Sequence, residues 1–135
     1  MSSAPKTLFE KYGGKSTVEK MVKYFYEELV LKDSLVSGFF TKTDMELQKK
    51  RQTNFVTFAL GGTDKYTGKT MKQSHQNMHI KNEHFYRIID HLTTTFKVHG
   101  VDPQDIAAIQ EKLNSFHDDI VEEPTSADQQ VRTLI

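Results

Sequence analysis

The sequence predicts an all-α protein, and three observations support this fold class. Apolar residues recur at spacings of three and four along most of the chain, which is the period of an amphipathic helix. Residues that favour helix starts precede these runs, and glycine or proline follows them. No segment shows the sustained alternation of apolar and polar residues that is typical of a half-buried strand.

The length and composition fit one folded domain. A chain of 135 residues can form one hydrophobic core but is short for two. The 18 basic and 18 acidic residues cancel, so no basic excess favours a nucleic-acid ligand. The absence of cysteine excludes disulfides, thiolate zinc sites and cysteine nucleophiles. Because no apolar run reaches the length of a membrane span, we expect a cytoplasmic protein that binds neither nucleic acid nor membranes.

Three parts are expected along the chain. Residues 1–7 are predicted to be a flexible lead-in, residues 8–121 a single domain, and residues 122–135 a polar tail. A short helix within 7–12 opens the domain, and the glycine pair at 13–14 stops it.

The first long helix is predicted to begin at residues 16–19. Their sequence, Ser-Thr-Val-Glu, matches a capping box, in which a hydroxyl and a carboxylate satisfy backbone N–H groups at the helix start. The apolar positions of this helix continue to Val30. The next segment, 32–38, is expected to be a turn or short helix that leads into two phenylalanines at 39–40.

The second long helix is predicted over 44–60. Residues 43–46, Thr-Asp-Met-Glu, match another capping box, and the glycine pair at 61–62 ends the helix. Further helix-breaking residues make 63–69 a loop. A short helix over about 70–76 is then expected to carry His75.

The last two helices are bracketed by similar signals. Asn82 is expected to cap a helix that ends at Gly100. Asp102 then serves as a cap with proline at the first helical position. Apolar residues stepping by three and four over 106–120 predict one further helix, which Pro124 closes.

Polar residues in otherwise apolar stripes are the first candidates for a functional site. Gln48, Gln52 and Phe55 follow one another at helical spacing, so they lie along one side of the second long helix. The glutamines either face water at the edge of the stripe or turn inward to partners, because an unsatisfied buried amide costs about 1–3 kcal/mol. Tyr26 offers the same choice between a core tyrosine and one that bonds these glutamines and a ligand.

The histidine that follows the glycine break has several interpretations. His75 lies one helical turn after Met71, and an imidazole facing an apolar pocket with amides suits a haem iron, which keeps a gas site on its other side. Taken alone, such a histidine is usually an ordinary surface or core residue. His75 and His79 also have the spacing of a helical zinc pair, although no third ligand is evident. A non-catalytic helical interaction module is a further alternative.

Six short motifs, taken together, resemble the truncated haemoglobins of group I. The resemblance covers about residues 8–120 and depends on the order and spacing of the motifs. It implies a two-over-two helical sandwich around haem b, with a very short first helix and a loop before the proximal histidine. The motifs are YGG at 12–14, FY at 25–26, FF at 39–40, TDM at 43–45, GGTDKYTG at 61–68 and MKQSH at 71–75.

The resemblance implies roles at both faces of the haem. His75 is similar in position to the proximal iron ligand. Tyr26, Gln48 and Gln52 are similar to distal residues that stabilise a gas ligand by hydrogen bonds. The implied function is reversible O2 binding with high affinity and slow release, with CO and NO as further ligands.

Other residues are implied to contact the cofactor or control access to it. Phe40 resembles a phenylalanine that stacks on the haem, and Phe55 resembles an aromatic residue at the mouth of a gas tunnel. Arg51 either pairs with a haem propionate or is a solvated charge. Met71 and Phe85 are predicted to be additional haem contacts.

Asn77 departs from the family pattern, and His117 matches it only loosely. Many relatives have glycine where this chain has Asn77, and asparagine tolerates left-handed backbone angles better than most residues. Some cyanobacterial relatives attach a haem vinyl group to a histidine on the last helix. For His117, however, an ordinary surface histidine is the favoured interpretation.

Nitric oxide dioxygenase activity is a further expectation from the resemblance. In this reaction O2 and NO yield nitrate, and an electron donor must return ferric iron to the ferrous state. The chain contains no flavin or nicotinamide motif, so a separate reductase is expected to supply the electron.

Overall fold

The computed structural model describes residues 7–63, 75 and 78–121, and this part of the chain is helical with no strand. The all-α class predicted from the sequence is confirmed.

Most of the short helix expected over 70–76, together with Met71 and Asn77, lies outside the described residues. In chain order the elements are α1 (Leu8–Lys11), α2 (Lys15–Tyr24), the π-helix η1 (Phe25–Leu29), the 3₁₀ turns η2 (Val30–Lys32) and η3 (Ser37–Phe40), α3 (Met45–Ala59), α5 (Asn82–Val98), α6 (Pro103–Asn114) and α7 (His117–Ile120).

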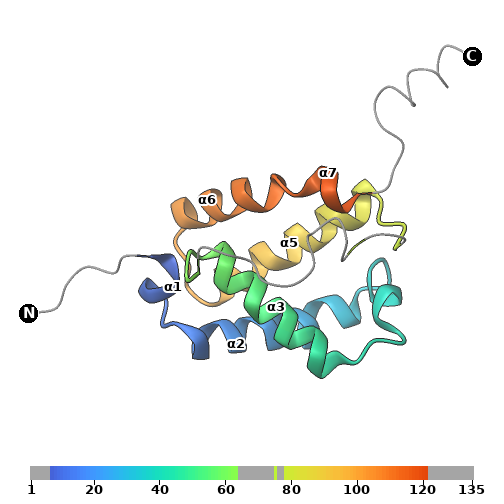
Figure 1. Cartoon of the computed structure of the whole chain (residues 1–135), viewed down its shortest axis with the longest axis horizontal. Coiled ribbons are helices and arrows are strands. Elements are labelled where there is room, and N and C mark those ends of the chain that lie inside the picture. Colours follow the sequence, from blue (N-terminus) through green and yellow to red (C-terminus); the bar gives the residue numbers. More distant parts are fainter. Residues whose placement is uncertain (1–6, 64–74, 76–77, 122–135) are drawn as a thin grey trace, which may run out of the picture.

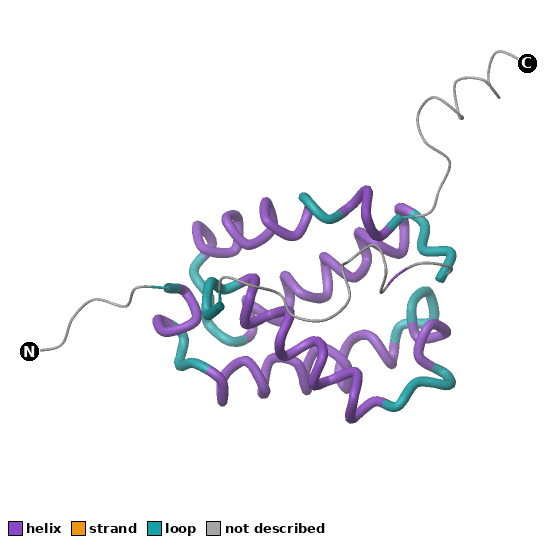
Figure 2. The backbone as a smooth tube through the Cα atoms, viewed as in Figure 1, coloured by secondary structure: helices purple, strands orange, loops and turns teal. Residues whose placement is uncertain are grey.

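The helices pack as two pairs, one over the other (Figure 1). In the first pair α2 and its continuation η1 lie against α3, and in the second α5 lies against α6. The pairs meet where η1 and α2 contact α5 and where α3 contacts α6. Figure 2 shows that short loops join most of these helices. This arrangement confirms the two-over-two sandwich that the sequence motifs implied.

The core lies between the two pairs and is almost entirely apolar. Thr95 is the single polar residue among the described residues that are buried, and its hydroxyl donates to the His91 carbonyl oxygen. None of the helices in 7–63 and 78–121 is long and apolar enough to cross a membrane. The buried apolar residues are Val18, Met21, Val22, Phe25, Tyr26, Val30, Val36, Val56, Ala59, Leu60, Ile80, Phe85, Ile89, Leu92, Phe96, Val101, Ile106, Ile109 and Leu113.

The first long helix changes from an α-helix to a π-helix at Phe25. The sequence predicted one amphipathic helix to Val30, but the α-helical part ends at Tyr24 and the chain continues as the wider π-turn of η1. Phe25 and Tyr26, which are adjacent in sequence, are both almost fully buried in this turn. Single π-turns of this kind are frequent at functional sites.

Both predicted capping boxes are wrong. The first helix starts at Lys15, because Gly13 and Gly14 take positive φ values of 108° and 73° and turn the chain into the helix before Ser16 is reached. Ser16 therefore lies in the first turn and caps nothing. At the second helix the cap is Asp44, whose carboxylate accepts from the N–H groups of Glu46 and Leu47.

The start of α5 and the end of the last helix also differ from prediction. Asn82 is the first helical residue and not the cap, because His84 Nδ1 accepts a hydrogen bond from the Lys81 N–H. Asp102 and Pro103 begin α6 as predicted. The single helix expected over 106–120 is broken between α6 and α7, where Phe116 leaves the helical conformation. Its ring then packs against the rings of two phenylalanines of α3.

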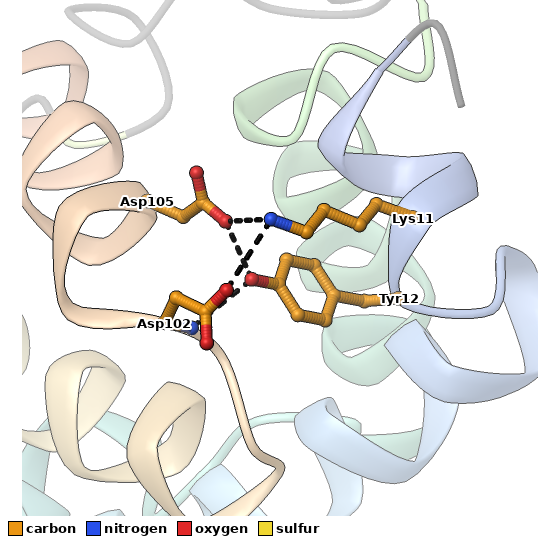
Figure 3. Close-up of polar contacts among 4 residues, drawn as sticks. All are labelled: Lys11, Tyr12, Asp102 and Asp105. Carbon is orange, nitrogen blue, oxygen red and sulfur yellow. Dashed lines mark hydrogen bonds and ion pairs between the residues drawn. The ribbon is translucent and has the colours of Figure 1, made fainter. Parts of the chain in front are cut away.

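A polar cluster ties α1 to the start of α6 (Figure 3). The Tyr12 hydroxyl donates to the Asp105 carboxylate and accepts from the Asp102 N–H at 3.0 Å. Lys11 Nζ lies 2.8 Å from the Asp105 carboxylate and 3.3 Å from that of Asp102. The hydrogen bonds from Lys11 and then Tyr12 lower the pKa of Asp105. Residues at the start of α6, which lie 90 to 94 positions later in the chain, thus hold the short first helix in place.

Replacing Tyr12 with phenylalanine is expected to destabilise the fold modestly. The change keeps the ring but removes both hydrogen bonds of the hydroxyl, and a hydrogen bond contributes about 1 kcal/mol on average. The two bonds together correspond to about 2 kcal/mol, so at neutral pH we expect Tm to fall by about 8 °C. Because the pKa of Asp105 is lowered by folding, the stability from its ionised form is present above the ordinary aspartate pKa and lost as pH falls through the lowered value.

The measurement is thermal unfolding of both proteins between pH 3 and pH 8. The difference in Tm between wild type and Tyr12→Phe should shrink towards the acid end. Tyr86→Phe provides a control, since Tyr86 is half-exposed on α5 and far in sequence from the cluster. Equal Tm values for wild type and Tyr12→Phe at pH 7 would contradict the stabilising role of the cluster.

Candidate functional site

A cavity of about 340 Å³ lies between the two helical pairs. Both pairs and the segment around η3 contribute to its walls, which are mostly aromatic and aliphatic. A few polar side chains, from different elements, also reach it. The lining residues are Phe25, Tyr26, Phe39, Phe40, Thr43, Gln48, Arg51, Gln52, Phe55, His75, Met78, Ile80, His84, Phe85, Ile88, Ile89, Leu92, Leu113, Phe116 and Ile120.

A phenol and an amide are hydrogen-bonded to each other in this cavity. Gln48 Nε2, on α3, donates to the Tyr26 hydroxyl oxygen of η1 at 2.9 Å. The amide nitrogen can only donate, so the phenol accepts this bond and keeps its own proton as a donor. Gln52 lines the cavity one turn further along α3. Gln48 thus turns inward to a partner, whereas Gln52 is half-buried and contributes to the cavity lining.

An ion pair runs beside the Tyr26–Gln48 bond and joins the same two elements. Glu27 follows Tyr26, Lys49 follows Gln48, and the Lys49 Nζ lies 2.9 Å from the Glu27 carboxylate. The hydrogen bond from Lys49 lowers the pKa of Glu27. The ion pair and the phenol–amide bond together connect η1 to α3 at the cavity.

Aromatic rings frame the phenol and the rest of the cavity. The ring of Phe40 contacts that of Tyr26 edge-on at a centroid distance of 5.5 Å. Phe55 contacts Phe116 in the same manner at 5.8 Å. Phe85 is buried and lines the cavity from α5. Edge-to-face pairs of this kind are favourable beyond their buried area, so they restrict the positions of the rings.

The predicted basic residue and the predicted histidine also reach the cavity. Arg51 is exposed but contributes to the cavity lining, as expected for a residue at its rim. His75 is half-buried and lines the cavity. The structure thus brings together every predicted site residue except Met71, which lies outside the described residues.

The zinc alternative finds no support in the described residues. His79 has φ of 58°, so the backbone at this position is not right-handed helix, and the helical spacing assumed for a pair with His75 is lost. Within 7–63, 75 and 78–121 no group of three histidine, aspartate or glutamate side chains could hold a metal ion. The left-handed position considered for Asn77 is observed at His79, whereas Asn77 itself is not described.

His117 is part of a side-chain cluster outside the cavity. Its Nε2 is hydrogen-bonded to the Asn82 side-chain oxygen, and its Nδ1 lies 2.9 Å from the Asp118 carboxylate. The ring packs edge-on against Phe85 at 5.0 Å and stacks on Tyr86 at 5.7 Å. Nε2 therefore joins α7 to α5, while Nδ1 contacts a neighbour within α7.

Among the cavity residues that were not assigned to the site from the sequence, His84 and Phe116 are the most informative. His84 lines the cavity and contacts the Phe39 ring. Its spacing of four from Ile88, on the cavity side of α5, was the available signal. Phe116 was placed inside a continuous helix, and no local signal marked the break that turns its ring towards Phe55.

The fold and the cavity together define a class of protein. Two stacked helical pairs enclose an apolar cavity that holds an imidazole, a phenol–amide pair and an arginine at the rim. This set of donors suits a haem: an imidazole for the iron, an apolar slot for the ring, a polar group for a ligand and a cation for a carboxylate. The class is that of haem-binding globins.

Comparison with known proteins identifies the family. The model of the bacterial-like globins matches residues 7–122. The group 1 truncated haemoglobin of Tetrahymena pyriformis is 44% identical over 97 residues, covering 72% of this chain and 79% of that protein. A Synechocystis group 1 truncated haemoglobin is 42% identical over 106 residues, covering 76% and 84%. The chain therefore belongs to the group 1 truncated haemoglobins.

Solved structures agree with this assignment. The ferric Tetrahymena pyriformis protein superimposes with a TM-score of 0.80 at 37% identity, covering 87% of this chain and all of that one. A Synechococcus 2/2 haemoglobin in the cyanomet state, with covalently attached haem, has a TM-score of 0.79 at 33% identity and covers 87% and 99%. Membership in this family makes the protein a haem b protein that binds gas ligands such as O2.

Proposed function

We propose that the protein binds O2 reversibly with high affinity, that His75 would bind the haem iron, and that Tyr26 would be the main hydrogen-bond donor to the gas. Haem supplies the iron that takes the ligand. The observation that carries the proposal is the bond from Gln48 to Tyr26 inside the cavity. The phenol accepts from Gln48 and lines the cavity, so it lies where a donor to a gas ligand is needed.

Each polar side chain has a distinct part in this proposal. Tyr26 donates to the ligand, Gln48 orients the phenol, and Gln52 is a second donor on the next turn of α3. Hydrogen bonds to a charged acceptor contribute about 1.5–3 kcal/mol, and O2 polarised by the iron gains charge. Donors in this position slow ligand release, so the protein suits tight binding better than delivery of O2.

The remaining cavity residues are proposed to hold the cofactor. Phe40 from η3 and Phe85 from α5 both line the cavity with aromatic rings. Arg51, at the rim, is proposed to pair with a haem propionate, because an arginine fork matches a carboxylate. Phe55 is proposed to lie at the mouth of a gas route. Met71 remains a predicted contact outside the described residues.

We also propose nitric oxide dioxygenation with an external reductase. One O2 and one NO combine to give one nitrate, and one electron from the reductase restores ferrous iron. The reaction requires a cavity that retains O2 and admits a second small molecule, and the apolar walls around Phe55 support this proposal. The reductase, like the cytoplasmic location expected from the sequence, remains a prediction.

Nitric oxide consumption tests this function directly. Mixing the oxygenated protein with one equivalent of NO in a stopped-flow instrument is expected to give ferric protein and about one equivalent of nitrate. Adding an excess of a chemical reductant should then allow repeated turnover. The CO-saturated protein is the control, because CO occupies the O2 site. NO loss without nitrate would contradict dioxygenation while leaving O2 binding intact.

A further inference from the structure

One carboxylate shapes the corner between η2 and η3. Asp33 lies in this corner, and its Oδ1 accepts a hydrogen bond from the Leu35 N–H at 3.0 Å. Its backbone oxygen accepts from the N–H groups of Val36 and Ser37 at 3.1 and 2.8 Å. Val36 is fully buried beneath the corner. These bonds define how the chain turns from one 3₁₀ segment to the next.

The second oxygen of the same carboxylate attaches the corner to α5. Asp33 Oδ2 lies 2.7 Å from His91 Nε2 and 2.9 Å from Arg87 Nη1. His91 and Arg87 are four residues apart and share one face of α5. Because a carboxylate oxygen only accepts, both side chains of α5 donate to it.

The Asp33–His91 contact is shielded from water. The side chains of Asp33 and His91 are only 11% and 16% exposed, whereas Arg87 is 45% exposed. Burial opposes the ionisation of Asp33, but hydrogen bonds from His91, the Leu35 N–H and Arg87 outweigh it and lower the pKa of the carboxyl. The Asp33 carboxylate is thus largely shielded and compensated by three donors, and loss of the His91 donor removes the more shielded of its two side-chain partners.

The residues that follow this corner form one wall of the haem cavity. Phe39 and Phe40, both in η3, line the cavity. The Phe39 ring contacts the His84 ring of α5 edge-on at 4.9 Å, and Phe40 contacts Tyr26. Only a few residues separate Asp33 from Phe39 and Phe40. The attachment of the corner to α5 therefore restricts the positions of these two rings.

We propose that Asp33 and His91 are positioning residues for the haem: their hydrogen bond holds the η2–η3 corner against α5, so that Phe39 and Phe40 close one wall over the cofactor. Neither residue lines the cavity, and both act through the phenylalanines. The inference needs only the haem binding that family membership establishes. It does not depend on the proposed distal chemistry of Tyr26.

The first measurement is haem dissociation from the ferric holoprotein into an excess of a high-affinity apoglobin. His91→Leu removes the donor at similar volume and is expected to accelerate haem loss about tenfold, the effect of one charge-assisted hydrogen bond. His91→Gln keeps an N–H donor and should restore most of the wild-type rate. Arg87→Gln alters the half-exposed partner of Asp33 and should also accelerate haem dissociation, but less than His91→Leu. It provides a second variant if His91→Leu folds poorly.

The second measurement is amide hydrogen–deuterium exchange of the ferric holoprotein. His91→Leu should speed exchange in residues 35–43 and leave α6 as in wild type. Two controls separate positioning from general destabilisation. Lys32→Gln removes an exposed pair with Glu28 that does not reach α5, and Tyr12→Phe lowers stability far from the corner. Both should keep the wild-type haem dissociation rate.

Two results would overturn the proposal. One is wild-type haem dissociation and corner exchange in His91→Leu, since the bond would then not hold the wall. The other is equally fast haem loss in Tyr12→Phe, which would show that any loss of stability releases the cofactor. Slow O2 release with an unchanged haem dissociation rate in His91→Leu would reject the positioning role while supporting the distal proposal.

Discussion

Replacement of His75 by alanine is expected to abolish normal haem binding. The imidazole is the proposed axial ligand, and its loss removes the one bond between protein and iron that the proposal contains. Absorption spectra of the reconstituted ferrous, ferric and CO-bound variant should lose the signature of an imidazole-ligated haem. Addition of free imidazole is expected to restore part of the wild-type spectrum by filling the space that the side chain left.

Two other histidines provide matched controls for this experiment. His79→Ala removes an exposed imidazole four residues away, and His117→Ala removes one that joins α7 to α5 outside the cavity. Both variants should keep the wild-type spectrum. Acid extraction should release the haem from the wild type and from both variants, as expected for a cofactor that is not covalently attached. A His75→Ala protein with a wild-type spectrum would refute the ligand assignment.

Replacement of Tyr26 by phenylalanine is expected to accelerate O2 dissociation by about tenfold to a hundredfold. The ring and its contact with Phe40 remain, but the donor to the ligand is lost. One hydrogen bond to a charged acceptor contributes about 1.5–3 kcal/mol, and each 1.4 kcal/mol is a factor of ten in rate when the association rate is unchanged. Stopped-flow replacement of O2 by CO measures the dissociation rate directly.

The role of Gln48 can be separated from that of Tyr26 by a double-mutant cycle. Gln48→Leu alone should also speed O2 release, because the phenol loses the partner that orients it. In the Tyr26→Phe background the same change should have little further effect, since no hydroxyl is left to orient. Additive effects would mean that the two residues act independently. Unchanged O2 dissociation in Tyr26→Phe would remove the phenol from the mechanism.

Much of the local structure could be predicted from the sequence because helix formation depends on near neighbours. Apolar spacing identified the amphipathic helices, and Asp102 with Pro103 correctly marked the start of α6. Helix starts elsewhere were less reliable. Gly14 and Ser16 are both possible caps of the first long helix, and Thr43 and Asp44 are both possible caps of the second. These alternatives place the helix start one or two residues apart, and the backbone geometry made Gly14 and Asp44 the caps.

The cavity could be anticipated only in part. Motif order placed Tyr26, Gln48 and His75 in one site, but the sequence alone allowed each glutamine to face water. The hydrogen bond between Gln48 and Tyr26 requires the π-turn of η1 to pack against α3, and residues 22 positions apart then meet. His84 was missed because its cavity contact depends on where the η3 corner lies.

The sequence by itself determined the helical class, the approximate extent of each helix and the set of polar residues available to a haem. Only the tertiary structure decided which of them face the cavity, how the last helix breaks at Phe116, and that Asp33 meets His91 across 58 positions of the chain. The reason is physical. Helix periodicity is encoded within a few turns, whereas the direction of a side chain in the core depends on what remote segments leave for it to contact.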